Sequence, residues 1–173
     1  VKDGKSRLFI SDDPQSLCAE AFRSMRASLG LLGREEDRKV VFFTSALPSE
    51  GKSFCCVNYA VAYAQQGKRT LIIDFDLRKP TLAESFGVEG EHSGVSEVLL
   101  GKVQLDQCVQ KTRFDNLFLL TAGGTVPNPA ELLSGQWTKK LIHEAAAKFD
   151  QVVLDNAPVN AVSDALLIVN EAQ

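Results

Sequence analysis

A Gly-Lys-Ser sequence at residues 51–53 stands between a strand-like and a helix-like segment, and this arrangement limits the chain to few folds. Residues 40–43 read Val-Val-Phe-Phe, which is typical of a buried parallel strand, and residues 54–66 show the pattern of a helix that ends at Gly67. The run matches G-x-x-x-x-G-K-[ST], except that Ala46 replaces the first glycine. Such a loop wraps a phosphate group with backbone N–H groups, and the following helix directs its positive end at the same charge. The sequence therefore predicts a nucleotide-binding loop.

Two side chains of this loop have specific expected tasks. Lys52 is expected to reach the β- and γ-phosphates of the nucleotide, and the Ser53 hydroxyl is expected to bind Mg²⁺. We place Lys52 in a solvent-facing loop, where its cation has no partner until phosphate arrives. The residues predicted to bind the nucleotide are Leu47, Pro48, Ser49, Glu50, Gly51, Lys52, Ser53 and Phe54.

Strand-like and helix-like segments alternate along the chain. The pattern predicts helices at 15–32, 52–66 and 136–148, short helices at 95–100 and 105–110, and strands at 40–44, 69–75, 117–120 and 151–155. It also predicts a Gly/Pro-rich loop at 123–129 and a last helix, capped by Ser163 or Asp164, that runs to Val169. This alternation predicts an α/β, three-layer P-loop NTPase fold, with a mostly parallel sheet and helices on both faces. We expect residues 1–173 to form a single P-loop domain with a truncated C-terminal end.

Composition excludes several classes of partner. The net charge of −3 gives no general attraction to nucleic acid or to anionic lipid. The four cysteines show neither metal-ligand spacing nor a disulfide framework, which is typical of a reducing cytoplasm. Because no apolar run approaches 18 residues, we expect a soluble domain that does not itself span a membrane.

Acidic residues follow two of the expected strands. Asp74 and Asp76 alternate, so we expect both on one side of an extended chain, where they can share a metal, a water or a proton. Asp155 follows an apolar run in the manner of a carboxylate that supports a metal ion. A carboxylate in such a position can instead cap the next helix. With the phosphate loop upstream, the two motifs together favour Mg²⁺–nucleotide chemistry.

Taken together, these motifs resemble those of the bacterial tyrosine kinases that regulate capsule and exopolysaccharide export. The phosphate loop of that family reads [AG]-x-P-x-E-G-K-[ST], which fits residues 46–53. Its second motif, an apolar pair followed by D-x-D-x-R, fits Asp74, Asp76 and Arg78. Its third motif, an apolar run followed by D-x-P-P, is met in part, because Asp155 is followed by Asn-Ala-Pro. The resemblance covers nearly the whole chain.

The resemblance implies an ATP-dependent protein-tyrosine autokinase that regulates polysaccharide polymerisation and export, with ATP and Mg²⁺ as cofactors. The implied catalytic residues are Lys52, Asp74, Asp76 and Arg78, and the implied metal-binding residues are Ser53, Asp76 and Asp155. Asp74 is the residue expected to orient or deprotonate the incoming tyrosine, although the sequence does not separate its role from that of Asp76.

A further motif concerns assembly. Glu20, Arg23 and Arg26 fit the family pattern E-x-x-R-x-x-R, and their spacing places them along one stripe of the first helix. The resemblance implies that neighbouring subunits of a homo-oligomeric ring meet at this stripe. The alternative is a solvated helix face with an intrahelical Glu–Arg pair.

Other partners are also implied by the resemblance alone. They are a tyrosine-rich tail, on this chain or a neighbouring one, and a membrane-spanning polysaccharide co-polymerase segment, fused or separate. These place the domain at the cytoplasmic face of the bacterial inner membrane. The sequence contains no such tail. The chain has two tyrosines, Tyr59 and Tyr63, and both lie within one expected helix at a spacing that suits packing.

Two other functions are weighed against the kinase. A partitioning- or septum-positioning-type ATPase shares the fold and acts as a nucleotide switch. Such proteins carry an extra lysine five positions before Lys52, where this chain has Leu47, and they seldom show D-x-D-x-R. The other is a regulator that binds ATP without transferring phosphate. Five intact residues argue against it, namely Lys52, Ser53, Asp74, Asp76 and Asp155.

Overall fold

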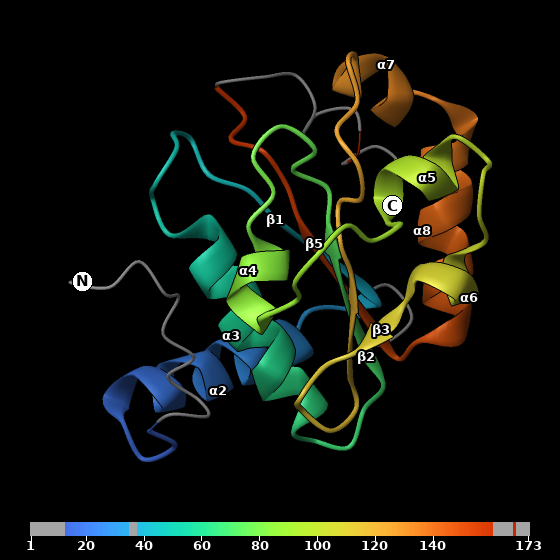
Figure 1. Cartoon of the computed structure of the whole chain (residues 1–173). Coiled ribbons are helices and arrows are strands. Elements are labelled where there is room, and N and C mark those ends of the chain that lie inside the picture. The colour runs from blue at the N-terminus through green and yellow to red at the C-terminus, as the bar shows by residue number, and fades with distance from the viewer. Residues whose placement is uncertain (1–12, 35–37, 161–167, 169–173) are drawn as a thin grey trace.

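The computed structural model describes residues 13–34, 38–160 and 168, and these residues form a five-stranded sheet with helices on both faces (Figure 1). The strands are β1 (Val40–Phe43), β2 (Thr70–Asp74), β3 (Gln110–Lys111), β4 (Leu117–Leu120) and β5 (Gln151–Asp155). Their order across the sheet is β1-β5-β2-β4-β3, and all neighbours are parallel except β3 and β4. The predicted three-layer α/β fold is confirmed.

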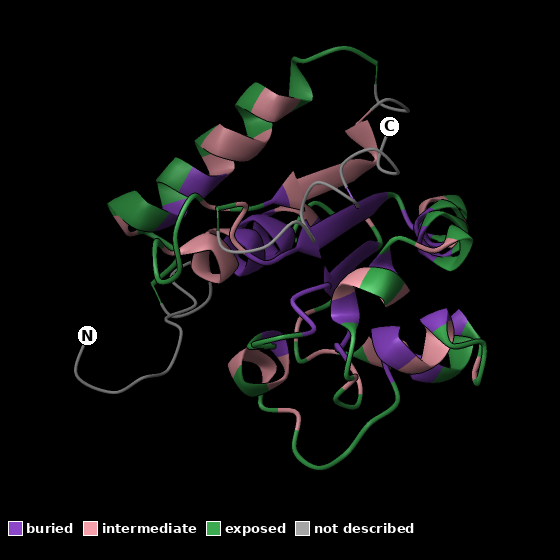
Figure 2. Cartoon of the chain, turned by 90° about the horizontal axis from the view of Figure 1, so that it is seen from above, coloured by how far each residue is buried: buried purple, intermediate pink, exposed green. Residues whose placement is uncertain are grey.

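The two central strands are buried along their whole length (Figure 2). Their sequences, Thr-Leu-Ile-Ile-Asp in β2 and Gln-Val-Val-Leu-Asp in β5, have apolar residues on both faces because helices cover both. Alternate residues enter different cores, so Leu71 and Ile73 pack on one side of the sheet while Ile72 packs on the other.

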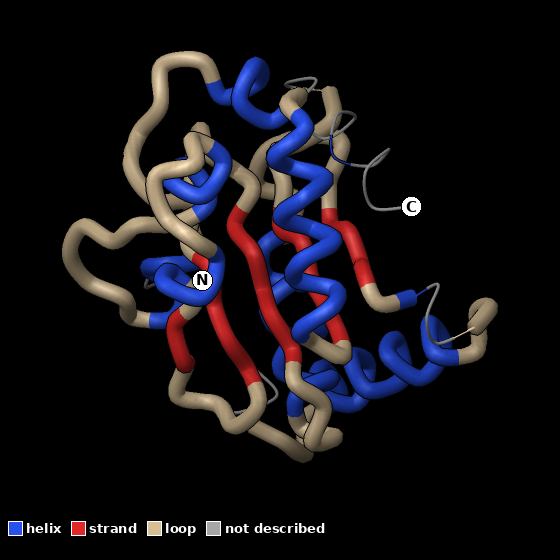
Figure 3. Tube along the Cα trace, turned by 90° about the vertical axis from the view of Figure 1, so that its right-hand side faces the viewer, coloured by secondary structure: helices blue, strands red, loops and turns tan. Residues whose placement is uncertain are grey.

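Two long helices cover the face that Ile72 enters. They are α2 (Leu17–Gly30) and α3 (Lys52–Ala64), and the short α4 (Leu82–Phe86) completes this layer. The opposite face is covered by α8 (Gln136–Lys148), with α5 (Val95–Leu99), α6 (Leu105–Cys108) and α7 (Pro129–Leu133) beside it (Figure 3). Among the residues the structure describes, no helix is both long and apolar enough to cross a membrane.

The long elements lie where the sequence predicts them, within two residues at each end. Three short elements were not predicted, namely β3, α4 and α7. Helix α7 begins at Pro129, the last residue of the predicted Gly/Pro-rich loop, because a proline fits the first turn of a helix. The predicted helix that ends at Val169 falls outside the described residues, apart from Ile168, which is buried in the core beneath α8.

Candidate active site

The predicted phosphate loop connects β1 to α3 at the carboxyl edge of the sheet. Helix α3 begins at Lys52, with Gly51 before it in a left-handed conformation at φ 90° that favours glycine. The first-turn N–H groups of this 13-residue helix have no intrahelical acceptors, so they and the helix dipole face the loop. The loop is therefore built to receive an anion.

Two side chains hold the loop in shape. The Glu50 carboxylate accepts the N–H of Leu47 at 3.0 Å, and the Ser45 hydroxyl donates to the Leu47 carbonyl at 2.9 Å. Sequence reasoning included Glu50 only as a residue of the motif. The sequence feature that could have indicated this bond is the three-residue separation of Glu50 from Leu47, because a carboxylate three residues along the chain can reach back to a backbone N–H.

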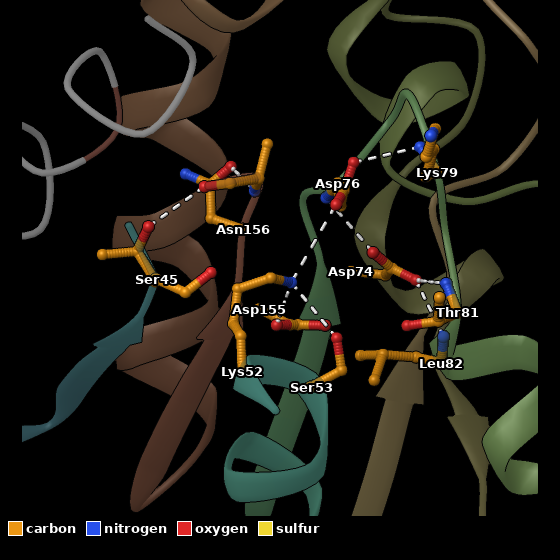
Figure 4. Close-up of polar contacts among 12 residues, drawn as sticks. Ser45, Lys52, Ser53, Asp74, Asp76, Lys79, Thr81, Leu82, Asp155 and Asn156 are labelled. Atoms are coloured by element: carbon orange, nitrogen blue, oxygen red, sulfur yellow. Dashed lines mark hydrogen bonds and ion pairs between the residues drawn. The ribbon is translucent and has the colours of Figure 1, made fainter. Parts of the chain in front are cut away.

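Lys52 has partners in the structure, so the prediction of a solvent-facing cation without a partner is wrong (Figure 4). Its Nζ atom lies 2.6 Å from Asp155 Oδ1 and 3.9 Å from Asp76 Oδ2, and it donates to Ser53 Oγ at 3.1 Å. The Lys52 side chain is only 9% exposed. A buried ammonium needs such a pairing, because burial without a counter-charge is costly.

Asp155 ends β5 directly opposite Asp74, which ends β2. Both residues are fully buried. Burial raises the pKa of Asp155, and the charge of Lys52 opposes this effect. Asp155 Oδ2 has no hydrogen-bond partner among the described residues, so one buried oxygen of this carboxylate remains available to a ligand.

Asp74 is bonded on both oxygens. Oδ1 accepts the N–H of Asp76 at 3.1 Å, and Oδ2 accepts the N–H groups of Thr81 and Leu82, each at 3.0 Å. Burial, with a contribution from the Asp155 charge, raises the pKa of Asp74 to about 7. The carboxylate therefore ties the end of β2 to the first turn of α4. The alternative that such a carboxylate caps the next helix is therefore met in part at Asp74. The particular donors, Thr81 and Leu82, were not predicted, because no motif marks a main-chain donor.

Asp76 points the other way. Its Oδ1 accepts the N–H of Lys79 at 3.0 Å, while its Oδ2 faces Lys52. The geometry does not support the expectation that Asp74 and Asp76 share one metal, water or proton. Of these two side chains, only that of Asp76 points towards Lys52 (Figure 4). Arg78 is exposed on the segment between β2 and α4.

Ser53, Asp76 and Asp155 surround Lys52 and can fit a magnesium ion. Among the described residues, no group of three His, Cys, Asp or Glu side chains forms a metal cage. Magnesium does not require one, since it binds through one or two carboxylates while phosphates and waters supply the other ligands. The free Asp155 oxygen beside the Ser53 hydroxyl is the kind of donor pair that such an ion takes.

The other predicted residues lie farther from this centre. Phe54 packs its ring against Phe22 of α2, with the ring centroids 5.7 Å apart. Tyr59 is buried and its ring contacts Phe43 and Tyr63, so the prediction that these tyrosines serve packing agrees with their positions.

Each residue of the predicted assembly stripe has a partner within the chain. Arg23 pairs with Glu20 at 3.1 Å and donates to the Pro14 carbonyl at 2.8 Å. Arg26 donates to the Ala62 carbonyl near the end of α3 at 2.6 Å. The intrahelical Glu–Arg pair of the alternative interpretation is therefore present, and Arg26 in addition joins two helices.

Comparison with known proteins extends this description. Residues 40–171 match the family described as AAA domain. Tyrosine-protein kinase YwqD of Bacillus subtilis is 44% identical over 160 residues, which are 92% of this chain and 67% of YwqD. The putative tyrosine-protein kinase CapB of Staphylococcus aureus is 38% identical over 92% of this chain and 70% of its own length.

Solved structures agree in fold. The kinase domain of the Escherichia coli tyrosine kinase ETK matches with a TM-score of 0.90 at 32% identity, covering 99% of this chain and 67% of that domain. The septum site-determining protein MinD from Pyrococcus horikoshii, solved with Mg-ADP, matches with a TM-score of 0.66 at 22% identity over 77% of this chain and 54% of MinD. The second match shows a shared fold only. With its phosphate loop, its paired carboxylates and relatives of this identity and coverage, the chain belongs to the family of bacterial tyrosine-protein kinases.

Proposed function

We propose that this chain transfers the γ-phosphoryl group of ATP to a tyrosine hydroxyl, and that it does so in a capsule or exopolysaccharide system. The observation that carries the proposal is the position of Lys52, a buried cation at the start of the phosphate-binding helix with Asp155, Asp76 and Ser53 around it. Phosphoryl transfer needs positioned positive charge and a metal site more than covalent chemistry, and this cluster supplies both.

The phosphate loop has the task of holding the nucleotide. The N–H groups at the start of α3 and the Lys52 ammonium offset the negative charge that develops on the transferring group. Lys52 must then exchange part of its contact with Asp155 for a phosphate oxygen. The carboxylate that it releases stays beside the Ser53 hydroxyl.

Ser53, Asp76 and Asp155 are the residues we assign to the magnesium ion. When bound, Mg²⁺ neutralises charge on the phosphates and orients them for in-line transfer. Asp76 Oδ2 and Asp155 Oδ1 already face Lys52, and Asp155 Oδ2 has no hydrogen-bond partner among the described residues, so little rearrangement of the protein is needed.

Asp74 receives a narrower role than the sequence predicts. Both of its oxygens accept backbone N–H groups, which supports a role in holding Asp76 and the 76–82 segment. We assign to it the shape of this segment, and we assign to Asp76 the contact with the reacting groups. A tyrosine hydroxyl with a pKa near 10 can lose its proton late in the transfer, so no strong base is required.

The acceptor and the assembly complete the proposal. The acceptor is a tyrosine-rich tail of this or a neighbouring chain, presented within a homo-oligomeric ring in which Glu20, Arg23 and Arg26 contact the next subunit. A membrane-spanning co-polymerase segment would hold the ring at the cytoplasmic face of the membrane. The names of the relatives YwqD, a tyrosine-protein kinase, and CapB, a putative one, support the activity.

The direct test is to incubate the chain with labelled ATP, Mg²⁺ and a random copolymer of glutamate and tyrosine, and to detect phosphotyrosine. A Lys52→Met variant serves as the inactive control, and Lys79→Met serves as a matched change of an exposed lysine on the 76–82 segment. We expect Mg²⁺-dependent phosphotyrosine from the wild type and from Lys79→Met. ATP hydrolysis without any phosphotyrosine would instead support a nucleotide-switched ATPase.

A further inference from the structure

A third carboxylate, Glu97 of α5, joins two backbone segments at the same edge of the sheet as the phosphate site. Its Oε2 atom accepts the N–H of Gly94 at 2.8 Å, and its Oε1 atom accepts the N–H of Gly124 at 3.2 Å. Gly94 precedes α5, whereas Gly124 lies beyond the end of β4. Burial opposes ionisation, but the hydrogen bonds from the Gly94 and Gly124 N–H groups hold the pKa of Glu97 below its usual range.

The two segments approach each other so closely that side chains are excluded. Val95 N–H donates to the Thr121 carbonyl at 2.8 Å, and a Cβ atom on Gly94 would lie 2.2 Å from that same oxygen. A Cβ atom on Gly123, whose φ is +82°, would lie 2.2 Å from Glu97 Oε2. Glu97 therefore fixes this junction as one rigid unit.

The junction lies next to the catalytic carboxylates. Strand β4 pairs with β2 in parallel, with Leu120 opposite Ile73, so Thr121 follows β4 at the edge where Asp74 ends β2. Across the sheet, the phosphate loop follows β1, then come Asp155 on β5, Asp76 after β2 and the 121–128 segment after β4. The 121–128 segment thus follows the strand beside β2, on the side of β2 that faces away from β5 and β1.

This order sets the direction from which an acceptor arrives. The attacking and leaving oxygens of a phosphoryl transfer lie roughly in line. The phosphate loop holds the leaving side, so the acceptor approaches from the opposite side, which the 121–128 segment borders. Gly124, Thr125, Pro127 and Asn128 of this segment are exposed.

We infer that the 121–128 segment is the surface against which the acceptor tyrosine lies, and that Glu97 is the positioning residue that holds this surface in place. The inference rests on the proposed kinase activity. It concerns binding of the acceptor only. The Glu97 carboxylate accepts the N–H groups of Gly94 and Gly124, and neither of these bonds involves Lys52 or the carboxylates around it.

The test separates acceptor binding from nucleotide binding. Glu97→Gln keeps the side-chain size but replaces one accepting oxygen with an amide that cannot accept. We expect the KM for a random copolymer of glutamate and tyrosine to rise about tenfold, while kcat at saturating copolymer and the Kd for Mg·ATP stay within about twofold. Glu144→Gln on α8 is the matched control, because its ion pair with Lys148 lies in the exposed part of that helix.

A second measurement does not depend on the variant folding. In the wild type, amide hydrogen exchange of residues 121–128 should slow when the copolymer is added to protein that already holds Mg²⁺ and a non-hydrolysable ATP analogue. An unchanged exchange rate there, or an unchanged copolymer KM in Glu97→Gln, would overturn the inference while leaving the kinase activity intact. A wild type that makes no phosphotyrosine would overturn both.

Discussion

At the scale of single residues, the position of Lys52 governs both stability and chemistry. The cation is buried between two carboxylates, so the pair with Asp155 contributes to the folded state before any nucleotide binds. Removing one partner of a buried pair leaves the other charge without compensation. A substitution at Lys52 is therefore expected to change the free energy of unfolding as well as the rate of transfer.

Lys52→Met should slow phosphoryl transfer at least about a hundredfold, because a single preorganised donor of this kind contributes about 3 kcal/mol to the transition state. It should also lower the free energy of unfolding at pH 8 by about 3 kcal/mol. The loss should be smaller at pH 5, because the buried Asp155 can then bind a proton. Urea titrations at the two pH values measure this, with Lys79→Met as the control. A variant as stable as the wild type at pH 8 would contradict the pairing.

Asp155→Asn and Asp74→Asn should differ in their effects. Asp155→Asn is expected to weaken nucleotide binding in the presence of Mg²⁺ but hardly in its absence, because its free oxygen is assigned to the metal. Asp74→Asn is expected to lower turnover more than affinity, because it disturbs the segment that carries Asp76. Binding titrations with and without Mg²⁺, beside single-turnover rates, compare them. Equal loss of Mg²⁺-dependent affinity would remove the distinction.

The pH dependence of stability should carry a contribution from Asp74. Its folded pKa of about 7 lies above the value near 4 that is expected for the unfolded chain, so the folded state binds more protons between these values. The stability that this residue contributes is fully present below about pH 4 and is lost as the pH rises through about 7. Asp74→Asn should therefore flatten the decline between pH 4 and 7. Chemical denaturation at pH steps tests this, and an unchanged slope would contradict it.

The residues of the site were predictable where a motif fixes them. Lys52, Ser53 and Asp76 converge as expected because the phosphate loop and the ends of parallel strands share one edge of the sheet. The pairing of Lys52 with Asp155 was not predicted, although both residues were placed at this edge, because the sequence does not show that the Lys52 side chain is buried. Strand alternation likewise could not show that backbone N–H groups occupy both oxygens of Asp74.

At the scale of elements, α2 is joined to the phosphate-binding helix at two points. Phe22 contacts Phe54 near the start of α3, and Arg26 donates to the carbonyl of Ala62 in its last turn. A cation at the C-terminal end of a helix bonds a carbonyl that has no intrahelical donor and also interacts favourably with the helix dipole. Arg26 is thus part of the fold of a single chain.

Arg26→Ala should lower the free energy of unfolding by about 1–2 kcal/mol, because it removes a charge-assisted hydrogen bond to a helix end. Arg23→Ala should cost less, about 0.5 kcal/mol, since its pair with Glu20 and its bond to the Pro14 carbonyl are both exposed. Arg23 is thus the natural control for Arg26. Urea denaturation measures both changes, and equal losses would show that the bond to Ala62 contributes little.

The long elements were predictable because each has a pattern of its own. Continuous apolar runs mark β2 and β5, and apolar residues at helical intervals mark α2. The short elements α4 and β3 were not predictable, because they form through contacts with residues in other parts of the chain. Helix α4 begins where Asp74 accepts the N–H groups of Thr81 and Leu82, and the two residues of β3 form a strand only through pairing with β4.

At the scale of the whole molecule, assembly should depend on Arg23 more than on Arg26, because Arg26 is engaged with α3. Arg23→Ala should shift the protein towards monomer with little change in melting temperature, since a contact repeated around a closed ring can decide whether the ring forms. The assembly should also weaken with salt, because at 1 M the Debye length is about 3 Å. Light scattering across a salt series tests both parts. An assembly that ignores salt and the substitution would leave the stripe as a solvated helix face.

The position of β5 in the sheet has a consequence for how the protein is synthesised. Strand β5 lies between β1 and β2, although it is the last of the five described strands to leave the ribosome. Until β5 is made, β1 has no strand of the described sheet to pair with. The phosphate loop then lacks the support of β5, and Lys52 lacks the negative charge of Asp155. Long-range parallel pairing of this kind forms late and cooperatively. We therefore expect a growing chain to carry the entire phosphate-loop sequence for about a hundred residues of translation before it can bind ATP, and to gain that capacity only once β5 and Asp155 are in place.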